Sequence, residues 1–441
     1  MIHDTDTGLK PGTCVAIEGD AHFRRLGWRR LTVVLIVESI ALGALSLPRV
    51  FADLGMVLGV VLCVTIGLIC MYGSFIIGQV KLKYPHVSHY ADIGGLMFAK
   101  PGYALIATFI TCHFILVSGS HCLTGTIALA NITQSSICSL AFSVISAVVL
   151  LLLALPPSFA DLAILGYIDF VSVLVAIGVT IVATGIRSSE PSTSPAHTAW
   201  SAWPREGLTF AEAFISVNNI VFAYAFTVVQ PSFMAEMHTP EDYVKATWAL
   251  TIMEIIIYII TGGTIYAFVG QDVEAPALLS AGPLISRVAF GLALPVIFIS
   301  GSINITVISR FIHGSLYRDS IVRYINTGKG WLTWIATVSI ITVISWAIAE
   351  AIPFFTELLS ITSSLFMSGF SFYFPGFMWF LLLKSGKWYS RHNIFGSFCA
   401  GSLCVIGFMI LVAGVYASIS ELVHKFQFNL IGRPYSCSLS S

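Results

Sequence analysis

Long runs of apolar residues, separated by short polar stretches, occupy most of this chain of 441 residues. A helix of roughly 20 apolar residues is long enough to cross a bilayer, and many of these runs reach that length. Because backbone groups find no water in lipid, runs of this length predict helices and exclude barrel strands. Hydropathy therefore predicts an all-α polytopic membrane protein. The eleven expected spans are residues 31–52, 56–80, 103–130, 137–155, 162–186, 209–234, 245–270, 288–309, 331–352, 357–383 and 394–420.

The composition agrees with this class and excludes others. Hydrophobic residues make up 56% of the chain and charged residues 10%, whereas soluble domains carry about a quarter charged residues. The net charge of +0 gives no basis for a nucleic-acid partner. None of the nine cysteines forms a CxxC pair, so we expect small apolar side chains rather than metal or redox sites. The eleven histidines are scattered, and no HExxH, GxSxG or P-loop motif occurs, so neither enzymatic activity nor a bound cofactor or metal is expected.

Lysine and arginine are distributed unevenly between alternate loops. If the N-terminus is cytoplasmic, 16 of these residues lie on the cytoplasmic side and 6 on the other. Because cytoplasmic loops are enriched in Lys and Arg, this bias predicts a cytoplasmic N-terminus and an extracytoplasmic C-terminus. The sequon that begins at Asn131 then falls in an outer loop and is a candidate for glycosylation. We expect the plasma membrane, with a vacuolar membrane as the alternative.

Ionisable residues inside the spans are candidates for function. A charge at the centre of a span costs about 2.5–3.5 kcal/mol on insertion scales, so such residues are expected to face a cavity. His113 and His121 in span three are interpreted as plain polar contacts, with contact to a transport path as the alternative. The carboxylates within spans are Glu38, Asp169, Glu212 and Glu254.

Polar and small residues recur every three or four positions in two of the spans. This spacing places them on one face of each helix. Such a face is typical of a wet cavity or of a polar contact between helices. The residues are Glu212, Ser216, Asn219, Ala223, Thr227 and Gln230 in span six, and Thr247, Thr251, Glu254, Tyr258 and Thr261 in span seven.

Helix-breaking residues interrupt the first span of each five-span set. Span one holds Gly43 and Pro48, and span six holds Asn218 with Asn219 and then Pro231. Glycine weakens a helix and proline removes a donor. Two broken helices, each the first of a five-span set, are the pattern of an inverted-repeat secondary transporter. The expected division is a cytoplasmic segment 1–30, a first repeat 31–186, an extracytoplasmic loop 187–208, a second repeat 209–383, an eleventh helix 394–420 and an extracytoplasmic tail 421–441.

Several stretches resemble the amino acid/auxin permease family. GALSLPRVFADLG, residues 43–55, resembles its first-helix signature, and ESIALGALSLP with YPHVSHYADIGG is similar to the fungal branch. FAYAFTVVQPSFMAEMHTPEDYVKA, residues 222–246, resembles the sixth helix and following loop, and residues 351–380 resemble the ninth-to-tenth helix region. The resemblance covers residues 30–420.

The resemblance implies a fold and an activity. The fold would be a LeuT-like bundle of five plus five helices with an added eleventh. The activity would be symport of amino acids, neutral and aromatic in similar fungal permeases, driven by protons or, in some animal members, by sodium. Many fungal relatives carry Gly-His where this chain has Phe226 and Thr227, which leaves the choice of substrate open.

A broken-helix site suits an amino acid, because freed N–H groups hold a carboxylate and freed carbonyls hold an ammonium. The expected partners are thus this small-molecule substrate and the lipid bilayer. We expect the substrate carboxylate on the N–H groups of the first span and the ammonium on carbonyls of the sixth. The expected contact residues are Gly43, Ala44, Leu45 and Ser46 in span one, and Asn219, Phe222, Ala223 and Tyr224 in span six.

Glu38 is the expected proton-coupling residue, because burial favours the neutral form of a carboxyl group. The alternative is a carboxylate that bonds Asn or Thr on span six or seven and fixes the bundle. Sodium is the competing coupling ion, with Ser300, Ser302 and Thr306 as possible ligands. A sensor that shares the transporter fold but carries no flux is the rival class of function.

Overall fold

A computed structural model describes residues 27–135, 137–157, 159–189, 200–317, 320, 322, 325, 327–428, 435 and 437. Within its helices, the side chains of residues 34, 37, 38 and 159–165 are not described. Most of the expected N-terminal segment therefore lies outside the described residues, and so does most of the tail after residue 428.

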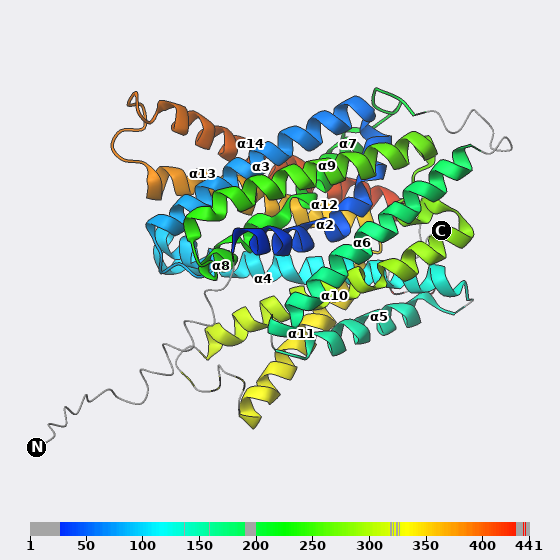
Figure 1. Ribbon diagram of the computed structural model, residues 1–441, viewed down its shortest axis with the longest axis horizontal. Helices are drawn as coiled ribbons and strands as arrows, with labels where there is room; N and C mark the ends of the chain where they lie inside the picture. Colours follow the sequence, from blue (N-terminus) through cyan, green and yellow to red (C-terminus); the bar gives the residue numbers. More distant parts are fainter. Residues whose placement is uncertain are drawn as a thin grey trace, which may run out of the picture.

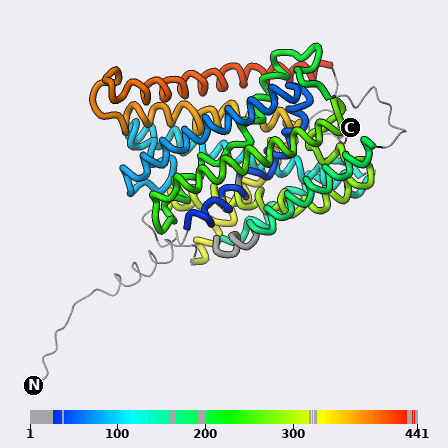
Figure 2. The backbone as a smooth tube through the Cα atoms, turned by 45° about the horizontal axis from the view of Figure 1, so that its top comes forward, coloured from blue at the N-terminus to red at the C-terminus, as the bar shows by residue number. Residues whose placement is uncertain are grey.

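The described part of the chain is helical and contains no strand. Eight of its helices are long and apolar enough to cross a membrane, and two shorter apolar helices accompany them. The helices lie side by side as tilted rods (Figure 1), with α14 along one edge of the bundle (Figure 2). The principal helices are α2 (Trp28–Leu54), α3 (Met56–Lys83), α4 (Tyr90–Thr133), α5 (Ser139–Ala154), α6 (Phe159–Ser188), α7 (Phe210–Ala223), α8 (Gln230–Ala235), α9 (Tyr243–Val269), α10 (Pro283–Leu316), α11 (Gly328–Ala351), α12 (Phe355–Thr362), α13 (Phe374–Met378) and α14 (Ile394–Gln427).

Short and irregular helices connect the principal ones. A 3₁₀ turn at Ala225–Val228 follows α7, and π-helical stretches at Ser363–Tyr373 and Trp379–Leu383 make α12 and α13 parts of one crossing segment. The third helix begins earlier than the expected span at residue 103. The helix α4 starts at Tyr90 and has a kink at Phe98 and Ala99.

The predicted break in the first span is wrong. The helix α2 runs from Trp28 to Leu54 with Pro48 inside it, and it ends at Gly55, whose φ of 78° suits glycine. Gly43 serves close packing instead: a Cβ at this position would lie 2.7 Å from the Cα of Ala223 on α7. The glycine therefore allows the backbones of α2 and α7 to touch. Pro48 removes one backbone donor, but α2 continues past it to Leu54.

The predicted break in the sixth span is confirmed. The helix α7 ends at Ala223, Tyr224 has φ −99° and ψ 38°, and the chain passes through a 3₁₀ turn before α8 begins at Gln230. Pro231 lies in the first turn of α8, where its missing N–H has no helical partner to lose. Two half-helices therefore replace one continuous span.

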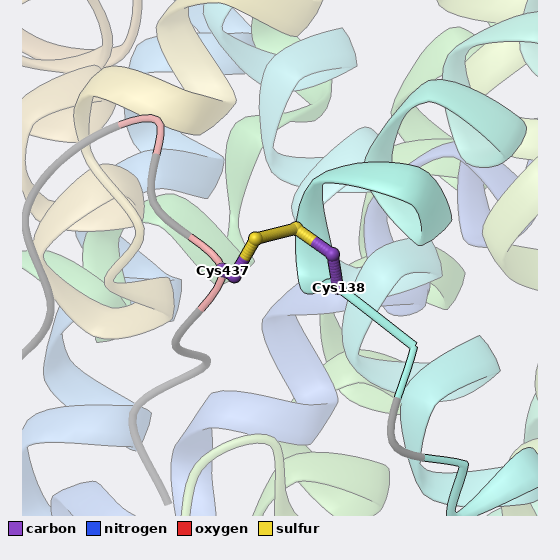
Figure 3. Close-up of a disulfide and its surroundings, with 2 residues drawn as sticks. All are labelled: Cys138 and Cys437. Atoms are coloured by element: carbon purple, nitrogen blue, oxygen red, sulfur yellow. A yellow bond between two sulfur atoms is a disulfide. The ribbon is translucent and has the colours of Figure 1, made fainter.

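The expectation that every cysteine is a plain apolar side chain is wrong for two of them. Cys138, just before α5, forms a disulfide with Cys437 of the C-terminal tail, 299 residues later (Figure 3). Tyr435 also anchors the tail, because its hydroxyl donates to the Ala347 carbonyl of α11 at 2.9 Å. Neither spacing nor local motif marks this pair in the sequence, since its two halves meet only in the folded chain.

We predict that Gly43→Ala destabilises the protein by about 1–3 kcal/mol, because the added methyl group would press on the backbone of Ala223. Thermal unfolding of the purified protein in detergent measures the change. Gly291→Ala is the matched control, because that glycine of α10 is exposed and a Cβ there meets nothing within 4 Å. Equal melting temperatures for the two variants would contradict the packing role of Gly43.

Candidate functional site

A small pocket lies beside the break that follows α7. Three helices and the break itself supply its walls, so residues far apart in the sequence meet here. Most of its lining is apolar, with a few polar side chains among it. The lining residues are Ser39, Ala41 and Leu42 of α2, His113, Phe114, Val117 and His121 of α4, Phe222, Ala225, Val228 and Val229 at the break, and Asn304 of α10.

Two buried polar atoms in the pocket lining have no hydrogen-bond partner among the described residues. They are Nδ1 of His113 and Oδ1 of Asn304, and both side chains are 3% exposed. A buried polar group without a partner costs about 1–3 kcal/mol, so such atoms mark a place where a ligand completes the bonding. By contrast, the ring Nδ1 of His121 lies 2.9 Å from the Ile297 carbonyl oxygen.

The two histidines were expected to be plain polar contacts, with contact to a transport path as the alternative, and the structure places both in the lining of the pocket. Their spacing of eight residues in one span fits a shared face of α4. This periodicity is the signal in the sequence that could have linked them, but nothing local shows that the face meets the break in α7.

Two tyrosines hold the backbone of the break. Tyr258 of α9 donates its hydroxyl to the Ala223 carbonyl at 2.6 Å and lies 3.2 Å from the Ser39 carbonyl. Tyr224 donates to the Cys63 carbonyl of α3 at 2.9 Å, and the two rings pack edge to face. The Ala223 carbonyl, which we expected to bind the substrate ammonium, therefore already accepts a hydrogen bond from Tyr258.

A buried carboxyl group lies one hydroxyl away from the pocket. Oγ of Ser39 is 2.5 Å from Oε1 of Glu254 on α9, and the Glu254 side chain is fully buried. The other oxygen, Oε2, has no hydrogen-bond partner among the described residues. The polar face of span seven identifies Glu254 in the sequence, but its contact with Ser39 follows only from the packing of α2 on α9.

Most of the residues expected to contact the substrate are not in the lining of the pocket. Of these residues, Phe222 lines the pocket. Gly43 contacts Ala223, and Ser46 donates to the Gly43 carbonyl at 2.8 Å, while Ala44 and Leu45 are fully packed. The α2 residues that reach the pocket lie about one turn earlier in the chain.

Two further residues expected at the site, Asn219 and Glu38, are not among the described residues that line the pocket. Asn219 is buried in α7, and its Oδ1 has no partner among the described residues. The side chain of Glu38 lies outside the described residues, so its expected role in proton coupling stays a prediction.

The three possible cation ligands on α10 do not share one acceptor. Ser300 donates to a carboxylate oxygen of Asp169 on α6. Ser302 donates to the Ile299 carbonyl at 2.8 Å, and Thr306 donates to the Ala154 carbonyl at 3.3 Å. Each hydroxyl therefore has its own partner in the protein.

Glu212, one of the four carboxylates expected to face a cavity, caps a helix instead. It accepts from the Thr209 N–H at 2.9 Å at the start of α7 and pairs with Arg205 at 2.7 Å. Arg205 and Arg49 both approach Asp53, with nitrogen–oxygen distances of 3.7 Å and 3.2 Å. This ion cluster joins the end of α2 to the start of α7.

Asn131 lies in the last turn of α4 and not in a loop, because that helix continues to Thr133. Its Oδ1 accepts a hydrogen bond from the Ser286 hydroxyl at 3.2 Å, and the residue is half-buried. Its glycosylation stays a prediction.

Comparison with known proteins gives one family over most of the chain. The sequence model of the family described as "Transmembrane amino acid transporter protein" matches residues 24–420. A relative named "N amino acid transport system protein" from Neurospora crassa is 54% identical over 431 residues, with 96% of this chain and 90% of that protein covered. A protein from Gibberella moniliformis named "Transmembrane transporter" is 26% identical, with 95% and 89% covered.

A solved structure shares the fold. Mhp1, a nucleobase-cation-symport-1 family transporter in a closed conformation with bromovinylhydantoin bound, superposes with a TM-score of 0.54 at 13% identity, with 93% of this chain and 94% of that one covered. The predicted LeuT-like helical bundle is thereby confirmed.

Tyr258→Phe is expected to lower the free energy of unfolding by about 1–3 kcal/mol, because the buried Ala223 carbonyl at the break loses its donor. Thermal unfolding in detergent checks this. The control is Tyr416→Phe on α14, where the tyrosine is 64% exposed. If both variants melt at the wild-type temperature, Tyr258 does not support the break.

Proposed function

The chain belongs to the transmembrane amino acid transporter family, and from this membership we propose that it carries neutral amino acids across the membrane together with protons. Transport would proceed by alternating access to the pocket beside the break in α7. Amino acids with aromatic side chains are included in the proposed substrates.

The observation that carries the proposal is the composition of the pocket. Its described lining contains no Asp, Glu, Lys or Arg, and Phe114, Val117, Phe222 and Val228 give it apolar walls. Such walls favour a substrate side chain without charge, since an unpaired charge there would lose its water.

We assign the amino and carboxyl groups of the substrate to the polar part of the pocket. Ser39, His113 and Asn304 supply side-chain groups there, and His113 and Asn304 carry buried atoms without a hydrogen-bond partner in the described part of the chain. The α2 contribution thus moves from Gly43 to Ser39, because Gly43 packs on Ala223. A proton is the preferred coupling ion because the three candidate sodium ligands direct their hydroxyl groups to acceptors on three different helices, α6, α10 and α5, which does not favour a common cation site.

We expect purified protein in liposomes to accumulate a radiolabelled neutral amino acid when the outside is more acidic than the inside, in sodium-free buffer. A protonophore should abolish the accumulation, because it removes the driving gradient. Val228→Trp is expected to abolish uptake too, because the indole fills the pocket. Accumulation that requires sodium would contradict proton coupling, and binding without any flux would indicate a sensor.

The disulfide supports the proposed orientation, with the N-terminus in the cytoplasm and the C-terminus outside. Cys138 and Cys437 both lie on the side that carries few Lys and Arg residues. Disulfides persist in oxidising compartments and are rare in the cytosol. A plasma-membrane location with this face outward therefore fits both observations.

In intact cells, a membrane-impermeant maleimide is expected to label the protein only after an impermeant reductant has opened the Cys138–Cys437 bond. The double variant Cys138→Ser/Cys437→Ser gives the background from the remaining cysteines. Labelling that appears only after the membrane has been permeabilised would place this face inside and reverse the orientation.

A further inference from the structure

The hydroxyl of Ser39 is within hydrogen-bond distance of two acceptors. Its Oγ lies 2.5 Å from Oε1 of Glu254 and 3.1 Å from the Leu35 carbonyl oxygen. A serine hydroxyl has only one hydrogen to donate. That hydrogen can point to one acceptor or be shared between the two. If the Glu254 carboxyl group is protonated, it supplies a second hydrogen, and each of the two contacts can then be a full hydrogen bond.

The surroundings of Glu254 also favour the neutral acid. Its side chain is 0% exposed, and Oε2 has no hydrogen-bond partner among the described residues. The described titratable groups that face it are Cys70 of α3, Tyr224 at the break after α7 and Tyr258 of α9 itself, and none of them is a cation. Glu38 of α2 is the neighbouring ionisable residue whose side chain is not described.

An ionised Glu254 would therefore be a buried charge that no described cation balances. No lysine, arginine or histidine in the described ranges forms an ion pair with it. A buried charge without compensation requires water or a rearrangement of its neighbours. The packing of α2 on α9 seen here thus suits one protonation state.

We propose that Glu254 is the residue that binds the transported proton, and that its protonation holds Ser39 of α2 against α9. This inference rests on the proposed function, because it names the site at which that transport cycle takes up its coupling ion. The proton binds Oε1 of Glu254, which then donates to Ser39 Oγ while Ser39 donates to Leu35. When water reaches the site from the other side, the same proton leaves to water and Ser39 turns its hydrogen toward the carboxylate.

The position of Ser39 connects this step to the substrate. Ser39 lines the pocket, and Tyr258 contacts both the Ser39 carbonyl and the Ala223 carbonyl at the break. A change in the hydrogen bonding of Ser39 therefore reaches the substrate site directly. Proton and substrate would stabilise the same packing of α2, which is the thermodynamic requirement for coupling.

The test uses full-length protein in liposomes that contain a pH-sensitive dye. Wild type is expected to move protons inward when a neutral amino acid is added. Glu254→Gln should retain exchange of labelled for unlabelled amino acid but lose this proton movement and the pH dependence of uptake. With a one-unit pH gradient and one proton per substrate, its accumulation should fall from about tenfold to about onefold.

Asp169→Asn is the matched control, because Asp169 is another buried carboxylate with a serine partner on a neighbouring helix. It is expected to keep proton movement. Proton movement retained in Glu254→Gln, or lost in Asp169→Asn alone, would overturn the inference while leaving the transport function intact. Wild type without uptake or exchange would instead overturn the proposed function.

Glu254→Asp keeps the test decisive if Glu254→Gln does not fold. The shorter side chain still ionises but no longer reaches Ser39 in the same way, so proton movement should persist with a displaced pH midpoint of uptake. An unchanged midpoint would overturn the inference, because a residue that only packs the helices would not set that midpoint.

Discussion

The contact between the backbones of α2 and α7 at Gly43 and Ala223 is the constraint on which the rest of the site depends. It brings the pocket-lining part of α2 beside the residues where α7 stops. A helix that ends in a membrane must find partners for its freed backbone groups. Here α9 supplies one of them, because Tyr258 donates to the Ala223 carbonyl. The pocket, the break and the buried Glu254 are therefore consequences of one close crossing.

The sequence predicts the helical bundle and the broken sixth span because both follow from local features. Apolar runs determine the spans, and Pro231 cannot continue a helix from the preceding turn. The first span shows the limit of this reasoning. Gly43 and Pro48 look like a break, but the role of Gly43 is set by Ala223, a residue of another helix.

The candidate site was predictable only in part for the same reason. Phe222 follows from the break and lines the pocket, and Glu254 follows from the polar face of its helix. The contribution of His113, Asn304 and Ser39 depends on how four segments pack, which periodicity within one helix does not reveal. The carboxylates within the spans also differ in their surroundings. Glu212 pairs with Arg205 and caps the start of α7, whereas Glu254 contacts the hydroxyl of a serine.

The link between Cys138 and Cys437 also has a consequence for biosynthesis. The two cysteines are 299 residues apart, and the described helices from α5 to α14 lie between them in the sequence. Cys138 must therefore wait as a free thiol while nearly all the remaining spans are made and inserted. A chain whose synthesis stops within these spans would keep that thiol unpaired, which gives a cell's quality control a chemical mark of incomplete synthesis.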